Sequence, residues 1–186
     1  SGFERSVELD SLATLACASD YFLEKHRFIA THCGVALSQR LPADFARMTI
    51  LRDPVDRVIS QYFYLRQGKS DFLPSKFARD LSLADFATCD HPSVSIFVHN
   101  PQTYHLHSDK NPTHRSLASS QNDREVLGTA RDNLATFRYV GIFDQLGAFY
   151  EASLKDIEIE TPVCHERGAT WESVSSADRD TIEGRV

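Results

Sequence analysis

The chain has 186 residues, which at about 150 residues per domain predicts one domain with a single hydrophobic core. It carries 20 basic and 26 acidic side chains, and the net charge of −6 argues against a surface built to hold nucleic acid or an anionic membrane. No run of about 18 apolar residues is present, and the first residues form neither a basic nor an apolar leader. The sequence therefore predicts a soluble segment.

Both ends of the sequence indicate a piece of a longer chain. The first residue is Ser1 instead of Met, and residues 180–186 read as a helix that stops without a cap. Residues 182–185, Ile-Glu-Gly-Arg, also match a protease site used in tags, but the helical pattern before them favours native sequence. We expect one domain over residues 1–186 that is incomplete at both ends.

Cysteine usage favours a reducing compartment. The four cysteines are separated by 16, 56 and 75 residues, without the close spacing of a disulfide framework or a zinc site. Cys164 and His165 alone are too few ligands for zinc. The sequence thus predicts idle thiols in a cytoplasmic protein, and a membrane anchor upstream of the chain stays open. The cysteines are Cys17, Cys33, Cys89 and Cys164.

The first predicted elements are one helix and two strands. Leucines at helical spacing predict a helix over residues 8–18, and β-prone runs predict strands over 27–32 and 47–52. A helix followed by a strand is a first indication of a layered fold.

The hydrophobic period changes from strand to helix directly after the second strand. Asp53 suits the N-cap and Pro54 the first helical position, and Gly68 is the expected stop after Gln67. The apolar stripe of this predicted helix is Val55, Val58, Ile59, Tyr62 and Phe63.

The second half of the chain alternates again between helices and a strand. Residues 82–85 resemble a capping box that opens a short helix ending near Thr88. Residues 90–119 read as a long polar connection rich in His and Pro, and a connection of that length is more often functional than accidental. A helix is expected from residue 120, with Val126, Leu127, Ala130 and Leu134 on one face.

Residues 137–143 predict a third strand, after which Asp144 is expected to cap a helix. Residues 175–178 predict the start of the last helix. This order of strands and helices favours an α/β fold with a mostly parallel sheet covered by helices. Ligands bind such sheets beyond the carboxyl ends of the strands, which points to His32, Arg52–Asp53 and Phe143–Asp144.

The second of these places has the residues of an anion site. Arg52 ends a predicted strand one residue before a helix begins, so unpaired N–H groups and the positive end of the helix dipole lie beside a guanidinium. Ser60 lies two turns further on and off the apolar stripe, where its hydroxyl can meet a ligand along the helix. The structural alternative is that Arg52 pairs with Asp56 and that Ser60 is only solvated.

Local charge supports the anion site. Between Gln39 and Lys69 there are six basic and three acidic residues, so this stretch is +3 in a chain of −6. A positive region inside an acidic domain fits a small anionic ligand better than a nucleic acid. An ordinary solvated helix face is the alternative.

The segment 49–66 (Thr-Ile-Leu-Arg-Asp-Pro-Val-Asp-Arg-Val-Ile-Ser-Gln-Tyr-Phe-Tyr-Leu-Arg) resembles the 3′-phosphate-binding segment of sulfotransferases that use 3′-phosphoadenosine 5′-phosphosulfate (PAPS). The branch with heparan sulfate 2-O-sulfotransferases and their bacterial relatives is the most similar. The resemblance implies a P-loop-NTPase-like fold and assigns the grip on the 3′-phosphate to Arg52 and Ser60. It also implies transfer of a sulfuryl group from PAPS to a hydroxyl acceptor, with a saccharide as one candidate, without a metal.

Other segments resemble the family in the same order. Residues 29–34 are similar to the family strand that ends in a general-base His, which implies that role for His32; a His bonded to backbone is the alternative. Residues 100–104 and 130–144 resemble later family segments. Arg167 lies where the family has a basic, Gly-containing loop over the donor's adenosine. Sulfuryl transfer needs positioning, a base and charge stabilisation, which these residue types supply.

One family feature is missing. The family has an N-terminal loop with a Lys that binds the 5′-phosphosulfate, and none of the five lysines of this chain stands in such a context. Residues 68–70, Gly-Lys-Ser, end a Walker-like motif, but Phe63 stands in place of its first Gly and they follow a helix. We expect the loop upstream of Ser1.

Several alternatives stay open. The main one is a non-catalytic nucleotide- or glycan-binding module of the same fold, and a P-loop kinase is a third reading without a clear Walker B-type Asp. Cys33 as a nucleophile lacks a paired helper. The histidines of residues 99–115 are expected in a polar loop near the acceptor channel, with metal binding through His105 and His107 as the alternative.

Overall fold

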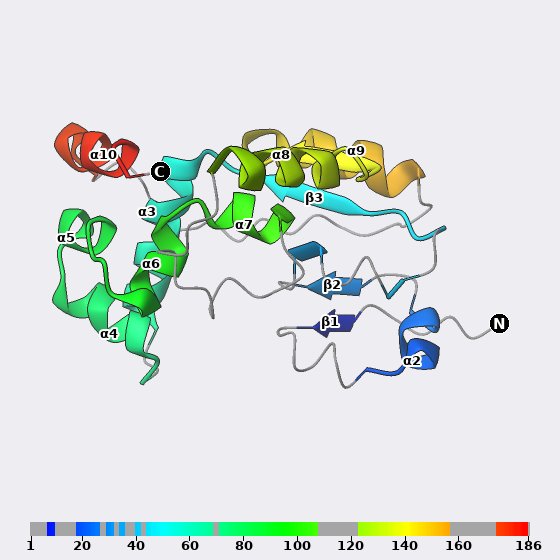
Figure 1. Ribbon diagram of the computed structural model, residues 1–186, viewed down its shortest axis with the longest axis horizontal. Helices are drawn as coiled ribbons and strands as arrows, with labels where there is room; N and C mark the ends of the chain where they lie inside the picture. The colour runs from blue at the N-terminus through cyan, green and yellow to red at the C-terminus, as the bar shows by residue number, and fades with distance from the viewer. Residues whose placement is uncertain are drawn as a thin grey trace. The chain divides into compact units, whose positions relative to one another are not determined.

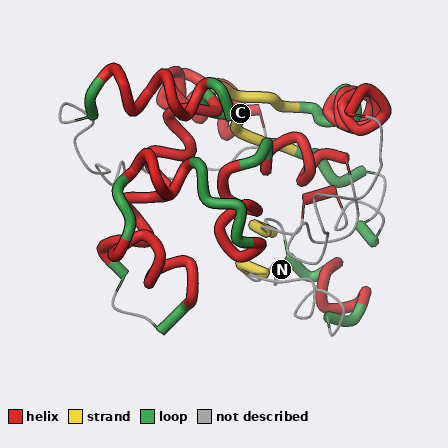
Figure 2. Tube along the Cα trace, turned by 60° about the vertical axis from the view of Figure 1, so that its left-hand side comes forward, coloured by secondary structure: helices red, strands yellow, loops and turns green. Residues whose placement is uncertain are grey.

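The computed structural model describes residues 7–9, 18–26, 29–31, 34–35, 40–41, 44–68, 71–107, 123–156 and 174–185. The chain divides into two compact units: Ser1–Met48 with Gln102–Tyr139, and Thr49–Pro101 with Val140–Val186. The described residues are mostly helical, with a few short strands (Figure 2). No helix among them is long and apolar enough to cross a membrane.

The first unit contains a small parallel sheet. Strand β1 (Val7–Leu9) pairs with β2 (Ile29–Thr31), and Val7 lies opposite Ile29 (Figure 1). Strand β2 confirms the strand predicted over 27–32. The helix predicted over 8–18 is wrong at residues 8–9, because pairing with β2 overrides the helical spacing of the leucines. Residues 10–17 lie outside the described part.

Helix α2 (Asp20–Glu24) had no counterpart among the sequence predictions. Ser19 caps it, since its side chain accepts a hydrogen bond from the Phe22 N–H at 3.1 Å. Leu23 is its buried residue, and Arg40 donates to the Ala18 carbonyl and to Asp20. A short helix with one apolar anchor offers too little periodicity to be recognised.

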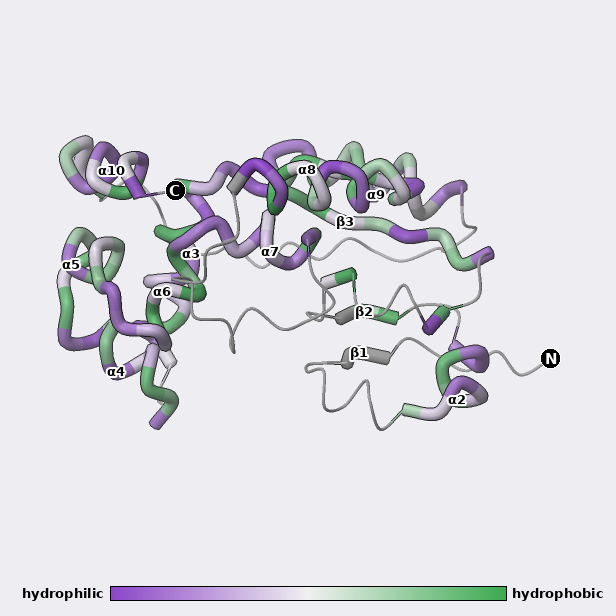
Figure 3. The backbone as a smooth tube through the Cα atoms, viewed as in Figure 1, coloured by the Kyte–Doolittle hydropathy of each residue, from purple (hydrophilic) through white to green (hydrophobic). Residues whose placement is uncertain are grey.

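Helices α7 (Pro101–His107) and α8 (Asp123–Leu134) complete the described elements of the first unit. The Asn133 side chain of α8 donates to the Leu106 carbonyl of α7 at 2.7 Å. The apolar face predicted for α8 is confirmed at Val126 and Ala130, which are buried, while Leu127 is exposed. The rest of α8 is mainly hydrophilic (Figure 3).

A second two-stranded sheet joins β3 (Met48–Leu51) and β4 (Tyr139–Ile142). The strands run parallel, because the Arg47 carbonyl meets the Tyr139 N–H at their starts while Arg52 meets Phe143 beyond their ends. The strands predicted over 47–52 and 137–143 are confirmed, with shorter bounds. The described chain is thus mixed α/β, mostly helical with small parallel sheets. The larger sheet of a P-loop-NTPase-like fold stays a prediction.

Helix α3 (Pro54–Gln67) begins and ends where the sequence predicts. Asp53 is its N-cap, and the buried stripe differs from the prediction only in that Leu65 is buried and Phe63 is half-buried. Gly68 is the C-cap in an extended conformation (φ −65°, ψ 128°), so its freedom to adopt a left-handed conformation is not what ends the helix.

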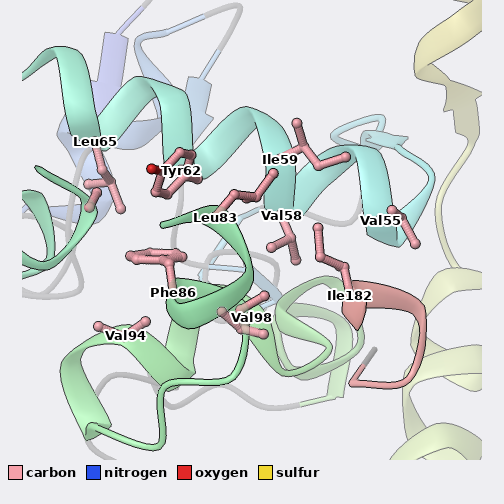
Figure 4. Packing of buried hydrophobic residues seen from close by; sticks show 12 residues of the cluster. Val55, Val58, Ile59, Tyr62, Leu65, Leu83, Phe86, Val94, Val98 and Ile182 are labelled. Atoms are coloured by element: carbon pink, nitrogen blue, oxygen red, sulfur yellow. The ribbon is translucent and has the colours of Figure 1, made fainter. Parts of the chain in front are cut away.

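The core of the second unit is built around α3. Helices α4 (Leu73–Asp80), α5 (Leu83–Ala87), α6 (Pro92–Val98) and α10 (Ser176–Glu183) pack beside it (Figure 1). Figure 4 shows Phe86 and Ile182 among the side chains of this core, and both are fully buried. Burial of each such side chain stabilises the fold by roughly 1.5–3 kcal/mol.

Two expectations about polar and terminal segments are wrong. Residues 92–107, expected in a long polar connection, form α6 and α7, because a proline opens each helix and a few apolar residues such as Val94 and Val98 suffice to dock α6. The last helix, expected to stop without a cap, ends at Glu183, where the Gly184 N–H donates to the Asp180 carbonyl.

The capping box predicted at residues 82–85 is confirmed, and so is the helix start predicted at residues 175–178. Ser82 accepts from the Asp85 N–H at 3.2 Å and donates to its carboxylate at 2.6 Å. Ser175 makes the same two contacts with Asp178. The cap predicted at Asp144 is wrong, because Asp144 lies inside the 3₁₀ helix η3 (Phe143–Gln145) that precedes α9 (Leu146–Asp156).

Candidate anion-binding site

Two of the four predicted site residues lie in the described structure. Arg52 follows β3 and Ser60 lies on α3, both in the second unit. His32 and Arg167 lie outside the described residues. The geometry below is therefore that of residues 49–66 and their neighbours alone.

The amide groups at the start of α3 are already bound. The Asp53 carboxylate accepts from the Val55 N–H at 2.9 Å and from the Asp56 N–H at 3.1 Å, and the Arg57 N–H donates to the Asp53 carbonyl. Pro54 has no N–H. The expectation of unpaired amides for an anion is thus wrong: in this conformation the side chains, aided by the helix dipole, would have to hold the ligand.

Arg52 stacks on an aromatic ring. Its guanidinium carbon lies 4.2 Å from the centroid of the Phe143 ring, and 41% of Phe143 is exposed. Burial lowers the pKa of Arg52, and the nearby carboxylates of Asp56, Asp144 and Asp53 oppose that shift. The ring fixes one face of a half-buried cation at the end of the sheet, where a ligand is expected.

Arg57 is turned toward the protein. Its Nη1 donates to the Phe97 carbonyl at 3.3 Å, at the last turn of α6. Burial lowers its pKa, and the positive charge of Arg52 lowers it further. Arg57 thus adds positive potential beside Arg52 while its own hydrogen bonding is directed to backbone.

Ser60 occupies the side of α3 that faces away from the core. At 100° per residue it lies on the same face as Asp56 and Arg57 and opposite the buried Val58 and Tyr62. The Ser60 side chain is half-buried, and within the described residues its hydroxyl has no hydrogen-bond partner. It lies roughly 10 Å along the helix axis from Asp53. A ligand that contacts both Arg52 and Ser60 must lie along this first part of α3.

Asp56 pairs with a residue far away in the sequence. Its Oδ1 lies 2.9 Å from Nη1 of Arg179, which belongs to α10 and is 123 residues distant. Asp56 thus forms an ion pair with Arg179, and the negative charge of Asp56 also opposes the lowering of the Arg52 pKa by burial. Nothing in the local sequence of Arg179 points to this contact, whereas Phe143 could be placed at the site because it ends a predicted strand.

The histidine and cysteine candidates do not form a metal centre in the described part of the chain. No group of three or more His, Cys, Asp or Glu side chains there could hold a metal ion. His99 Nδ1 is hydrogen-bonded to Ser95 Oγ at 2.6 Å, and His107 Nδ1 is buried without a hydrogen-bond partner among the described residues. Cys89 is a half-buried free thiol. Cys33, His114, Cys164 and His165 lie outside the described residues.

Comparison with known proteins gives no relative. No protein-family model, no curated protein and no solved structure matches the chain significantly.

Proposed function

We propose that the chain is part of a PAPS-dependent sulfotransferase and that the start of α3 binds the 3′-phosphate of the donor nucleotide. The observation that carries the proposal is the placement of Arg52. It is a half-buried cation at the ends of two parallel strands, held against Phe143, and the half-buried Ser60 lies on the side of the adjoining helix that faces away from the core. This arrangement fits the roles that the resemblance of residues 49–66 implies for the two side chains.

Sulfuryl transfer from a nucleotide requires a site that binds the nucleotide with positive charge. As sulfur leaves the donor, negative charge grows on the nucleotide, so a fixed nucleotide and preorganised positive charge lower the barrier. A guanidinium binds phosphate through charge-assisted hydrogen bonds, and its stacking on a ring reduces the motion that binding would have to suppress. A hydroxyl acceptor then needs a base, for which His32 is the candidate.

The binding step is tested by calorimetric titration with 3′,5′-adenosine bisphosphate (PAP), the product form of the donor. Arg52→Ala should weaken binding by about 10- to 150-fold, the value of a charge-assisted hydrogen bond, and Ser60→Ala by about 2- to 10-fold. Arg131→Ala, which removes an exposed cation on α8, is the control and should leave the affinity unchanged. Equal PAP affinity of Arg52→Ala and the unchanged protein would show that Arg52 does not bind the 3′-phosphate.

The second candidate function is a non-catalytic nucleotide- or glycan-binding module of the same fold. It is favoured by the absence of a lysine in the context of a phosphosulfate loop among the five lysines of the sequence. Transfer of labelled sulfuryl from PAPS to a panel of hydroxyl acceptors, including saccharides, separates the two when it is measured on the complete protein. The enzyme predicts transfer that His32→Ala abolishes with PAP binding retained, and weaker PAP binding in Arg167→Ala. The module predicts binding without transfer.

A further inference from the structure

The ion pair between α10 and α3 lies beside the proposed phosphate site. We propose that Arg179 is a positioning residue: by holding the Asp56 carboxylate, it prevents Asp56 from competing with a phosphate for Arg52. The inference rests on the proposed function, and it concerns how one acidic residue is tolerated within an anion site.

The contact itself is well defined. Nη1 of Arg179 lies 2.9 Å from Oδ1 of Asp56, and 37% and 31% of the two side chains are exposed. Asp56 is in the first turn of α3, one turn before Ser60 and on the same face. A carboxylate at this position repels an incoming phosphate and attracts the Arg52 guanidinium. The negative charge of Asp56 also acts on Arg52, because it opposes the lowering of the Arg52 pKa by burial.

Helix α10 has docking contacts besides Arg179. Ile182 of α10 is fully buried in the core around α3, and Val174 packs against the same core. Arg185, just after α10, donates to the Thr88 carbonyl at 2.8 Å and lies 3.3 Å from Asp90. We therefore expect α10 to stay docked when Arg179 is removed. The Arg179–Asp56 pair is half-buried, so it also contributes to the packing of α10, and the control variant Arg185→Ala separates that contribution from a role toward Asp56.

A double-mutant cycle on PAP affinity tests the inference. Arg179→Ala should weaken PAP binding by about tenfold, because it leaves an uncompensated carboxylate at the site. Asp56→Asn should bind at least as tightly as the unchanged protein. The double variant should return to the affinity of Asp56→Asn. If the double variant is as weak as Arg179→Ala alone, or if Arg179→Ala binds normally, the inference is wrong.

Arg185→Ala is the matched control. It removes the other arginine contact that ties this end of the chain to its neighbours, but it does not touch Asp56. The inference predicts unchanged PAP affinity for this variant. Weakening as large as that of Arg179→Ala would show that general loosening of α10 is responsible and would overturn the inference.

A measurement without nucleotide separates this inference from the proposed function. In the ligand-free protein, the Arg52 Nε–H resonance should shift in Arg179→Ala, where Asp56 turns to Arg52, and return in the double variant. An unmoved resonance in Arg179→Ala contradicts the inference whatever the PAP result. If the resonance moves as expected but the unchanged protein does not bind PAP, the proposed function fails and the hold of Arg179 on Asp56 stands.

Discussion

Asp53 caps α3 beside the candidate site. Its replacement by alanine should lower the free energy of unfolding and at the same time strengthen the binding of PAP. Its carboxylate accepts from the Val55 and Asp56 N–H groups at 2.9 and 3.1 Å. Loss of an N-cap costs about 1 kcal/mol, and loss of a negative charge at a helix start costs about 0.3–1 kcal/mol more. Because Asp53 is exposed and water can reach the amide of Asp56, we expect the free energy of unfolding to fall by about 1–1.5 kcal/mol in Asp53→Ala. Asp53→Asn keeps the acceptor and should lose less than half as much.

Urea denaturation followed by circular dichroism measures the loss, and amide hydrogen exchange locates it. The Val55 and Asp56 amides should exchange about 5- to 10-fold faster in Asp53→Ala, while amides near Tyr62 keep their protection relative to global unfolding. With two amides freed and one carboxylate removed beside Arg52, PAP should bind more tightly to the same variant. Unchanged stability together with unchanged exchange at both amides would refute the capping argument. Weaker PAP binding would refute the view that Asp53 closes the amides to an anion.

Three further predictions concern two glycines and a histidine. Gly34 has φ +60°, and a Cβ there would lie 2.3 Å from the His105 carbonyl oxygen, so Gly34→Ala should lower the free energy of unfolding by at least about 1–2 kcal/mol in urea melts. In Gly128→Ala, where a Cβ meets nothing within 4 Å in a helix interior, stability should instead rise by up to about 1 kcal/mol. Burial, then Arg185, lower the pKa of His99 below 6.5 against the opposing charge of Asp90. The unfolded chain therefore binds the proton more readily, so stability should fall as the pH drops below about 6.5, and urea melts of His99→Gln should show a shallower fall. An identical pH dependence of the two proteins would remove His99 as the cause.

Elements with a local signal in the sequence could be predicted well. The start of α3 follows from Asp53 and Pro54, whose effects act within one or two residues, and the structure confirms it. The end at Gln67 is also where the sequence predicts it, although Gly68 does not adopt the left-handed conformation that makes glycine a helix stop. The caps Ser82 and Ser175 are similar cases. Such signals depend on backbone geometry next to the residue itself, which tertiary packing rarely reverses.

Elements that depend on distant contacts could not be predicted in the same way. The leucine spacing at Leu9 indicated a helix, but the pairing of Leu9 with Thr31 makes it a strand. Helices α6 and α7 lie in a sequence rich in His and Pro, and their few apolar residues form no clear helical pattern. A few apolar side chains are enough to dock a short helix when the rest of the core is already present. At the candidate site, Arg52 and Ser60 were predicted from their positions around one strand end, whereas the contact of Arg179 with Asp56 spans 123 residues and leaves no local pattern.

Recognition of a 3′-phosphate at the start of α3 is tested by comparing the affinities for PAP and for adenosine 5′-monophosphate, which lacks that group. We expect the unchanged protein to bind PAP more tightly than the monophosphate, by about 10- to 150-fold. This preference should disappear in Arg52→Ala, while the affinity for the monophosphate stays the same. A preference that persists in Arg52→Ala, or equal affinity of the unchanged protein for both nucleotides, would contradict recognition of the 3′-phosphate at this site.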